Sequence, residues 1–245
     1  MREPGKEGGG WWNALKNGGV PSAIASVLGT HSAQQIAFLR SLTKGKRRPE
    51  TLHVPLRELE TAVFDLETTG FLYKQGDEIL SFGAVKTDGE RVELENTFYT
   101  LTRSSCPIPP EITALTGITQ EMVEQASPLV ESLHGFMSFV DDRVLVAHGS
   151  AHDKSFLDTA LWRTSKVRLS HRVLDTMMIA QKLDHDDRIA SLDDWLGIYG
   201  IPVANRHHAL EDAKMTAFLW LALVDRLRER GVHTLGDLYI FLSQT

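Results

Sequence analysis

Apolar and polar positions alternate along the chain from about residue 60, and this pattern predicts regular secondary structure. Short apolar runs at 62–67 and 79–86, and a β-rich run at 93–101, are typical of strands. The turn sequence Thr87-Asp-Gly89 separates the second run from the third. We therefore expect these three strands to form an antiparallel meander.

Strand and helix patterns alternate over the rest of the chain. Buried-type apolar runs predict strands at 143–148 and 173–175. Helical patterns predict helices at 120–125, 129–140, 152–165, 176–183, 191–199, 209–230 and 235–242. This order predicts an α/β fold in which a mixed sheet, with an antiparallel meander and parallel strands, is flanked by helices on both faces.

The first 52 residues have a different composition, rich in glycine and small residues. Two short helices are predicted at 21–28 and 32–42, and the basic run 44–48 predicts a linker. The Trp11-Trp12 pair is interpreted as an anchor onto the main domain or onto a partner. We expect residues 1–52 to form a small helical, flexible extension with a basic linker, and residues 53–245 to form the main domain.

Bulk properties narrow the class of protein. The chain has 245 residues, of which 42% are hydrophobic and 24% charged, as in soluble globular proteins. It has no apolar run of the ~18 residues that a membrane span requires, and MREPGKEGGGWW lacks a signal core. The single cysteine, Cys106, fits a reducing compartment. We expect a cytoplasmic protein with no membrane partner.

The net charge of −6 disfavours broad, nonspecific binding to a nucleic-acid duplex. It is compatible with acidic side chains that gather around divalent cations, because bound ions are then the largest local charges. The charge therefore argues against a protein that binds duplexes broadly more strongly than it argues against a metal-dependent hydrolase of nucleic acids.

The segment Ala62-Val-Phe-Asp-Leu-Glu-Thr-Thr-Gly70 holds the first candidate chemistry. Side chains two apart on a strand point to the same face, so Asp65 and Glu67 project together at the end of an apolar strand. Their mutual repulsion is removed by a hard cation such as Mg²⁺ or Mn²⁺. Alone, the pair is equally explained by a strand that runs into solvent.

Two later segments add a third and a fourth carboxylate. Asp153 lies in the first turn of the predicted helix 152–165, where the helix dipole alone would explain it. His207 and Asp212 open the predicted helix 209–230, and they converge only if the histidine lies on the preceding loop. Such a histidine has the mobility and the pKa that a general base needs.

Taken together, these segments resemble the DEDDh exonuclease family, which includes the proofreading subunit of bacterial replicative DNA polymerases. The agreement extends over roughly residues 60–226 and includes Phe64-Asp-Leu-Glu-Thr-Thr-Gly70, Leu115-Thr-Gly-Ile-Thr119 and Val173-Leu-Asp-Thr176. The resemblance implies a ribonuclease H-like fold for an exonuclease domain at 53–245, with two divalent cations, Mg²⁺ or Mn²⁺, beside a 3′ terminus.

The resemblance also implies roles for individual residues. Asp65, Glu67, Asp153 and Asp212 would hold the metals, and His207 would accept the proton of the attacking water. The product would be a nucleoside 5′-monophosphate. Residues expected to grip the terminal nucleotides are Thr68, Thr69, Gly70, Leu115 and Ile118, although Leu115 and Ile118 are equally interpreted as core.

The chain departs from the family at the second motif. Gly149 stands where members often have asparagine, and His152 stands where an aromatic residue directly precedes the aspartate. This change affects the packing of the terminal nucleotide more than metal binding. We interpret His152 either as a substrate-binding side chain that stacks on a base or as packing at the helix start.

Three functions stay open at this point. The first is a 3′–5′ exonuclease that acts on single-stranded or frayed DNA 3′ ends in proofreading or repair, with a DNA polymerase in trans as the partner expected for proofreading. The second is a 3′–5′ exoribonuclease, since recognition of the 2′-hydroxyl leaves no readable motif. The third is a weakly catalytic module that binds nucleic-acid ends.

Overall fold

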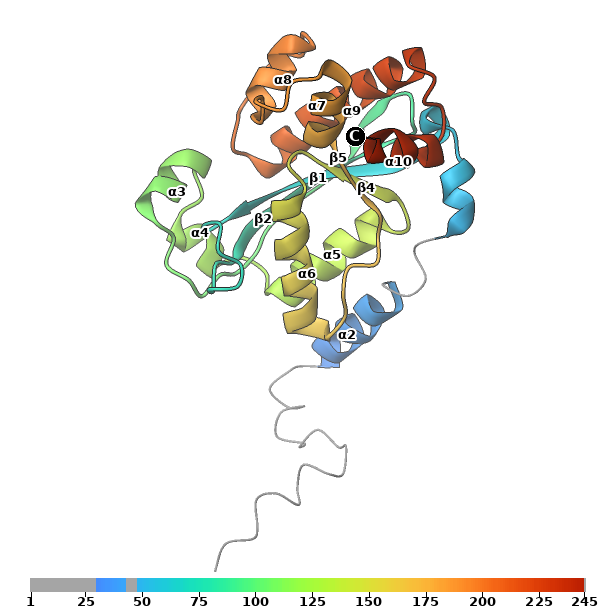
Figure 1. Cartoon of the computed structure of the whole chain (residues 1–245). Helices are drawn as coiled ribbons and strands as arrows, with labels where there is room; N and C mark the ends of the chain where they lie inside the picture. Colours follow the sequence, from blue (N-terminus) through green and yellow to red (C-terminus); the bar gives the residue numbers. More distant parts are fainter. Residues whose placement is uncertain (1–29, 43–47, 245) are drawn as a thin grey trace, which may run out of the picture.

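The computed structural model of the chain describes residues 30–42 and 48–244 (Figure 1). The predicted helix 21–28, the Trp11-Trp12 pair and most of the basic run 44–48 lie outside the described residues. In the part of the chain that the structure describes, no helix has both the length and the apolar character needed to cross a membrane.

Five strands form a single mixed sheet with the order β3-β2-β1-β4-β5. β1 pairs antiparallel with β2, and β2 pairs antiparallel with β3, whereas β1–β4 and β4–β5 are parallel pairs. The predicted combination of a meander with parallel strands is therefore confirmed. The strands are β1 (Thr61–Thr68), β2 (Ile79–Thr87), β3 (Val92–Leu101), β4 (Val144–Ala147) and β5 (Val173–Asp175).

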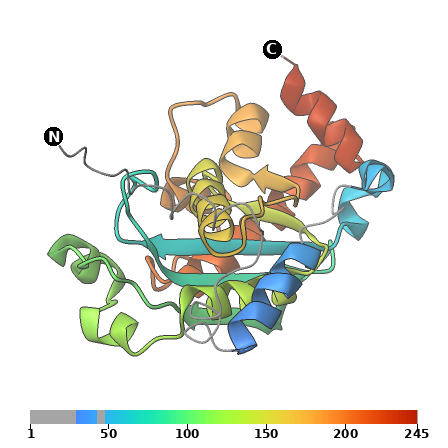
Figure 2. The same ribbon diagram turned by 90° about the horizontal axis from the view of Figure 1, so that it is seen from below.

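Helices cover both faces of this sheet (Figures 1 and 2). One face packs against α2 (Thr30–Leu42), α5 (Leu129–Val140) and α6 (Ala151–Ser165). The other packs against α7 (Thr176–Asp184), α8 (Leu192–Ile198), α9 (Ala209–Glu229) and α10 (Leu235–Ser243). The short helices α3 (Pro110–Thr116) and α4 (Gln120–Glu124) project beyond one end of the sheet.

The alternation of side chains along β1 decides which face receives the acidic residues. Phe64 and Leu66 are buried in the core beneath α5 and α6, and Val63 is buried in the core beneath α9. Asp65 and Glu67 have the same parity as Val63, so they point toward α9. The apolar pattern of the strand thus places both carboxylates on the face that α9 covers.

The segment before residue 60 packs against the main body. Leu39 of α2 is fully buried in the core with α5 and α6, and Figure 2 shows α2 beside α5. Pro49–His53 forms a 3₁₀ turn next to α10, and Leu56 N–H donates to the carbonyl of His233 (2.8 Å). The division at residue 52 stays a prediction, although residues on both sides of it pack against the main body: Leu39 on one face of the sheet and Leu56 on the other.

Helix α3 has no counterpart among the helices predicted from the sequence. The structure shows that Leu115 lies on α3, which begins with Pro110 in its first turn and ends at Gly117 with φ of 73°. Proline at the start and glycine just after the end are typical of a helix. At 7 residues α3 is too short for a clear apolar period, which explains the omission.

A close backbone approach sets the position of α9 on the sheet. Gly83 of β2 lies opposite Asp65 in the register of the two strands. A Cβ atom at Gly83 would lie 2.1 Å from the carbonyl carbon of Ala209 and 2.2 Å from the nitrogen of Leu210. The start of α9 can lie on the sheet beside Asp65 only because position 83 has no side chain.

We expect Gly83→Ala to lower the free energy of unfolding by about 1–3 kcal/mol or more, because the methyl group would overlap the backbone of α9. Urea denaturation measures this change. Gly197→Ala in α8 is the matched control: its Cβ would meet nothing within 4 Å, and alanine favours a helix over glycine by about 0.5–1 kcal/mol. Equal stability of Gly83→Ala and the parental chain would contradict the close approach.

Candidate active site

A cleft of about 260 Å³ lies where β1 ends. Its walls come from the segment after β1, from α3, and from the first residues of α6 and the start of α9. The polar residues that carry its chemistry are Asp65, Glu67, Arg206, His207 and Asp212. The cleft therefore unites four of the five predicted catalytic residues.

Three of the carboxylates are placed to share one cation. Asp65, Glu67 and Asp212 each offer an oxygen, and these oxygens lie within 4.8 Å of one another. Asp212 Oδ1 is buried and has no hydrogen-bond partner among the described residues. A buried carboxylate oxygen is costly unless a donor or a cation meets it, and three converging carboxylates suit a hard divalent ion. The side chains present fit the predicted metal.

The fourth carboxylate, Asp153, reaches the site from the opposite face of the sheet. It lies in the first turn of α6 and is 4% exposed. Leu66 N–H donates to its Oδ1 (3.2 Å), which places Asp153 directly beside the strand segment that bears Asp65 and Glu67. The helix-dipole explanation and the functional one are both consistent with this position.

Burial and mutual repulsion raise the pKa values of these acids when no cation is bound. Desolvation raises the pKa of Asp65 well above its usual value, and Asp153, Glu67 and Asp212 raise it further, whereas Arg206 opposes them. Desolvation and Asp212 raise the pKa of Glu67 to about 7. Desolvation, partly offset by backbone hydrogen bonds, raises the pKa of Asp153 to about 8. Such shifts are typical of functional sites.

His207 lies on the loop before α9, as expected from its spacing to Asp212. Its backbone has φ of 62°, and its N–H donates to Asp212 Oδ2 (3.1 Å). The next residue, His208, has a different environment, because its ring stacks on Tyr99 with centroids 4.5 Å apart. The structure thus places His207 in the cleft and His208 against the sheet edge.

The sequence patterns did not identify Arg206 as part of the site. Its guanidinium forms an ion pair with Asp212 Oδ2, and its Nε–H donates to Asp193 Oδ1 (2.6 Å). Among the described residues of the cleft it is the only arginine or lysine. An arginine directly before His207 was the available signal, because a cation there would lie next to a predicted carboxylate cluster.

The unusual residue Gly149 has a conformational explanation. Its φ is 62°, and a Cβ there would meet nothing within 4 Å, so the backbone conformation rather than space favours glycine. Asparagine also tolerates this conformation, so the departure from the family pattern preserves the turn. Asp175 accepts from Gly149 N–H (3.0 Å) and Ser150 N–H (2.7 Å), which fixes the start of α6.

His152 forms part of the cleft wall. Its ring lies 5.4 Å from that of Phe71 and 4.7 Å from that of Phe156, and its Nε2 lies 3.4 Å from Thr68 Oγ1. Burial lowers the pKa of His152, so a neutral ring is favoured. Phe71 is 78% exposed, and with His152 it forms an aromatic edge at the mouth of the cleft.

The other predicted substrate-binding residues divide into two groups. Thr68, Gly70 and Leu115 line the cleft, and Leu115 is 50% exposed on α3. Thr69 instead donates through Oγ1 to Asp77 Oδ1 (3.1 Å). Ile118 is buried in a small core with Leu80 and Val123, which matches its interpretation as core. Contact of Thr69 or Ile118 with a substrate stays a prediction that the cleft geometry does not support.

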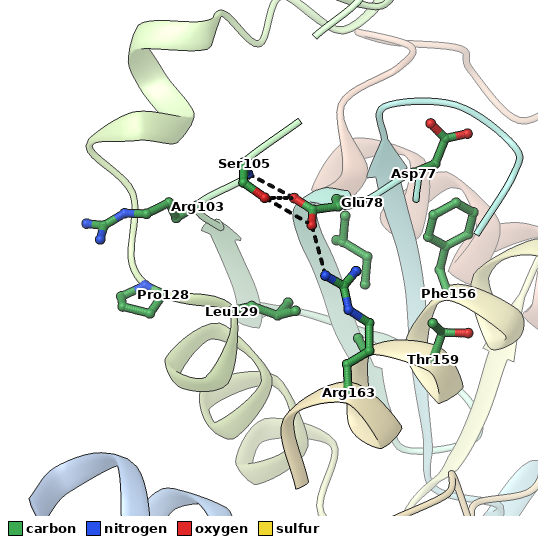
Figure 3. A pocket seen from close by; sticks show the side chains of 11 residues that line it. Asp77, Glu78, Arg103, Ser105, Pro128, Leu129, Phe156, Thr159 and Arg163 are labelled. Carbon is green, nitrogen blue, oxygen red and sulfur yellow. Dashed lines mark hydrogen bonds and ion pairs between the residues drawn. The ribbon is translucent and has the colours of Figure 1, made fainter. Parts of the chain in front are cut away.

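A second hollow, of about 300 Å³, lies between Asp77 and Glu78, just before β2, and Thr159 and Arg163 of α6 (Figure 3). Figure 3 shows Ser105 and Arg163 converging on Glu78, whose Oε2 accepts from Ser105 N–H (2.9 Å) and whose Oε1 accepts from Arg163 Nη2 (3.2 Å). Desolvation raises the pKa of Glu78, but these hydrogen bonds lower it below its usual value. Protein donors thus satisfy the Glu78 carboxylate, and these hydrogen bonds join the end of the segment before β2 to Ser105 and to Arg163 of α6.

Comparison with known proteins reveals a family match over most of the chain. The family described as Exonuclease (RNase_T) matches residues 62–219. A DNA polymerase III PolC-type protein of Caldanaerobacter subterraneus is 34% identical over 187 residues, which cover 76% of this chain and 13% of that protein. A DNA polymerase III subunit epsilon-like protein of Rhodobacter capsulatus is 38% identical over 185 residues, covering 74% and 26%. The chain thus spans about a quarter or less of these two relatives.

Two solved structures with a similar fold are exonucleases. Exonuclease X, solved in complex with 5′ overhanging duplex DNA, has a TM-score of 0.57 and 20% identity, covering 75% of this chain and 99% of that one. The nuclease domain of 3′hExo, a DEDDh family member bound to rAMP, has a TM-score of 0.59 and 22% identity, covering 70% and 92%. At these identities the likeness concerns the fold, and it confirms the predicted ribonuclease H-like architecture.

We expect the metal-free protein to lose stability as the pH rises from about 5 to about 8. The folded-state pKa values of Glu67 (about 7) and Asp153 (about 8) lie above the ~4 of unfolded carboxyl groups. Their stabilising contribution is therefore complete below about pH 4, falls as the pH rises toward 7 and 8, and is lost once the pH exceeds these folded-state values. Urea midpoints measured in EDTA test this expectation.

Added Mg²⁺ or Mn²⁺ should remove most of this pH dependence, because cation binding favours the deprotonated carboxylates. Glu67→Gln, which deletes one titrating group, should show a smaller loss in EDTA than the parental chain. A urea midpoint that stays constant in EDTA from pH 5 to 8 would contradict the electrostatics described above.

Proposed function

The chain belongs to the exonuclease family, and we propose that it is a metal-dependent 3′–5′ exonuclease that hydrolyses the terminal phosphodiester bond of DNA. The product would be a nucleoside 5′-monophosphate. The observation that carries this proposal is the convergence of Asp65, Glu67 and Asp212 within 4.8 Å, in one cleft with His207.

Each residue of the cleft has a role in the proposed reaction. Bound divalent cations would activate the attacking water and stabilise charge on the leaving oxygen. Asp65, Glu67 and Asp212 would hold them, and Asp153 would complete the acidic site. His207, on its loop at the cleft edge, would accept the proton of the water at an imidazole nitrogen. Two ions, and their identity as Mg²⁺ or Mn²⁺, are part of the proposal.

The mouth of the cleft supports an unpaired strand as the substrate. Phe71 and His152 present aromatic rings there, and Leu115 faces the same opening from α3. Bases stack on such rings only after they leave a duplex, and this stacking contributes about 1–3 kcal/mol per base. We therefore propose single-stranded or frayed 3′ ends as the ligand.

DNA is proposed as the polymer because the relatives at 34% and 38% identity are named as DNA polymerase III proteins. Their names also support a DNA polymerase as a partner and a proofreading or repair role. RNA is the second candidate, since one structure of the same fold holds rAMP. A cytoplasmic location is proposed on the single cysteine alone.

The decisive experiment compares DNA and RNA oligomers of equal sequence, each labelled at the 5′ end, with Mg²⁺ or Mn²⁺. We expect a ladder of shortened, still labelled DNA products and slower cleavage of RNA. Asp65→Ala should give no products, because it removes a metal ligand. Immediate release of labelled mononucleotide would show the opposite polarity, and faster cleavage of RNA would favour the exoribonuclease.

The same experiment separates an enzyme from a module that only binds ends. If the parental chain cleaves neither polymer, and if Asp65→Ala binds 3′ ends as tightly as the parental chain, the binding module is correct. Thermal unfolding of both proteins must first show that each is folded, so that lack of cleavage is not confused with lack of structure.

His207→Asn should lower turnover by on the order of 10²-fold while Mn²⁺ affinity stays nearly unchanged, because the general base is lost but no metal ligand is. Asparagine is chosen because it tolerates the φ of 62° at this position. His208→Phe, which keeps a ring against Tyr99, is the matched control and should retain turnover within a few fold. Parental turnover of His207→Asn across pH 6–9 would exclude His207 as the base.

A further inference from the structure

Arg206 connects two helices that lie on the same face of the sheet. Its Nε–H donates to Asp193 Oδ1 in the first turn of α8, and its Nη1 forms an ion pair with Asp212 Oδ2 in the first turn of α9. The Arg206 side chain is 21% exposed, the Asp212 side chain 6%, and the Asp193 side chain 53%. The bridge therefore runs from solvent to the buried carboxylates.

The two carboxylate oxygens of Asp212 have different environments. Oδ2 faces Arg206 and also accepts from His207 N–H (3.1 Å). Oδ1 is buried and has no hydrogen-bond partner among the described residues. The terminal torsion of an aspartate is soft, so contacts that hold Oδ2 determine where Oδ1 points. Oδ1 of Asp212 is thus available to bind a cation together with Asp65 and Glu67.

The same bridge acts on the loop that bears His207. Asn205 and His207, on either side of Arg206, have φ of 46° and 62°, in the left-handed region that is unfavourable for residues other than glycine. Contacts from Arg206 to α8 and α9 oppose relaxation of this loop. Arg206 thereby restrains both Asp212, a proposed metal ligand, and the loop of His207, the proposed base.

We propose that Arg206 and Asp193 form a positioning relay that orients Asp212 toward the cation and holds His207 beside the attacking water. Neither residue is a catalytic residue; both act through Asp212 and the loop. The inference rests on the proposed function and adds to it two residues outside the four carboxylates and the histidine. Outer partners of metal ligands typically change metal affinity or activity by 10–100-fold.

The test uses the full chain and two readouts: Mn²⁺ binding by calorimetry, and kcat and KM on a single-stranded DNA oligomer. Arg206→Gln should weaken Mn²⁺ binding by about 10–100-fold and lower kcat with little change in KM. Asp193→Asn, which leaves Arg206 in place, should act in the same direction to a smaller extent. Arg206→Lys should recover only part of the loss, because lysine keeps the charge but not the planar fork.

A control pair joins α6 to the segment that follows it. Arg168 and Asp158 form another arginine–aspartate pair (2.6 Å), with side chains 63% and 28% exposed. Arg168→Gln should leave Mn²⁺ affinity and kcat unchanged. If Arg206→Gln does not fold, Asp193→Asn still decides, because its half-exposed side chain can be altered without emptying the core.

Several results would overturn the relay. Equal or tighter Mn²⁺ binding by both Arg206→Gln and Asp193→Asn would show that Arg206 is a bystander or a cation that competes with the metal. Failure of the parental chain to bind Mn²⁺ would reject the relay together with the metal site. A parental chain that binds Mn²⁺ but cleaves no nucleic acid would reject the proposed function, while weaker binding by the variants would still support the relay.

Discussion

The position of the whole site depends on one close contact, the approach of α9 to β2 at Gly83. Gly83 lies opposite Asp65 in the strand register, and the backbone of Ala209 occupies the space that a side chain at 83 would need. The first turn of α9 therefore lies directly over the strand that bears Asp65 and Glu67. Asp212, in that first turn, then meets them, and His207 on the preceding loop reaches the same cleft.

This proximity creates an electrostatic cost that the protein alone offsets only in part. Four carboxylates converge on the site, and Arg206 is the one positive side chain among the described residues of the cleft. Arg206 opposes the rise in the pKa of Asp65 and of Glu67, yet the pKa of Glu67 still reaches about 7. The remaining negative charge suits divalent cations. This local concentration of acids contributes to the net charge of −6.

Local patterns predicted most of the fold and the acidic residues, whereas contacts between distant segments did not appear in them. The parity of β1 placed Asp65 and Glu67 on one face, helix starts placed Asp153 and Asp212, and the family resemblance that united them is confirmed. Two features escaped: α3, which is too short for an apolar period, and the bridge from Arg206 to Asp193, which joins residues 13 positions apart on different elements. The packing of α2 against α5 was equally invisible, because the two helices lie far apart in sequence.

Gly149 and His152 differ from the residues that the family often has at these positions. The arrangement of the cleft in two parts explains how both differences are tolerated. The oxygens proposed to bind metal come mainly from β1 and α9, and Asp153 accepts from Leu66 N–H. The wall proposed to contact the terminal nucleotide comes from α3, the segment after β1 and the start of α6. Gly149 preserves the left-handed turn that asparagine also tolerates, and His152 supplies a ring against Phe71 and Phe156. A change in the wall can therefore alter which strand end fits while the acidic site keeps its geometry.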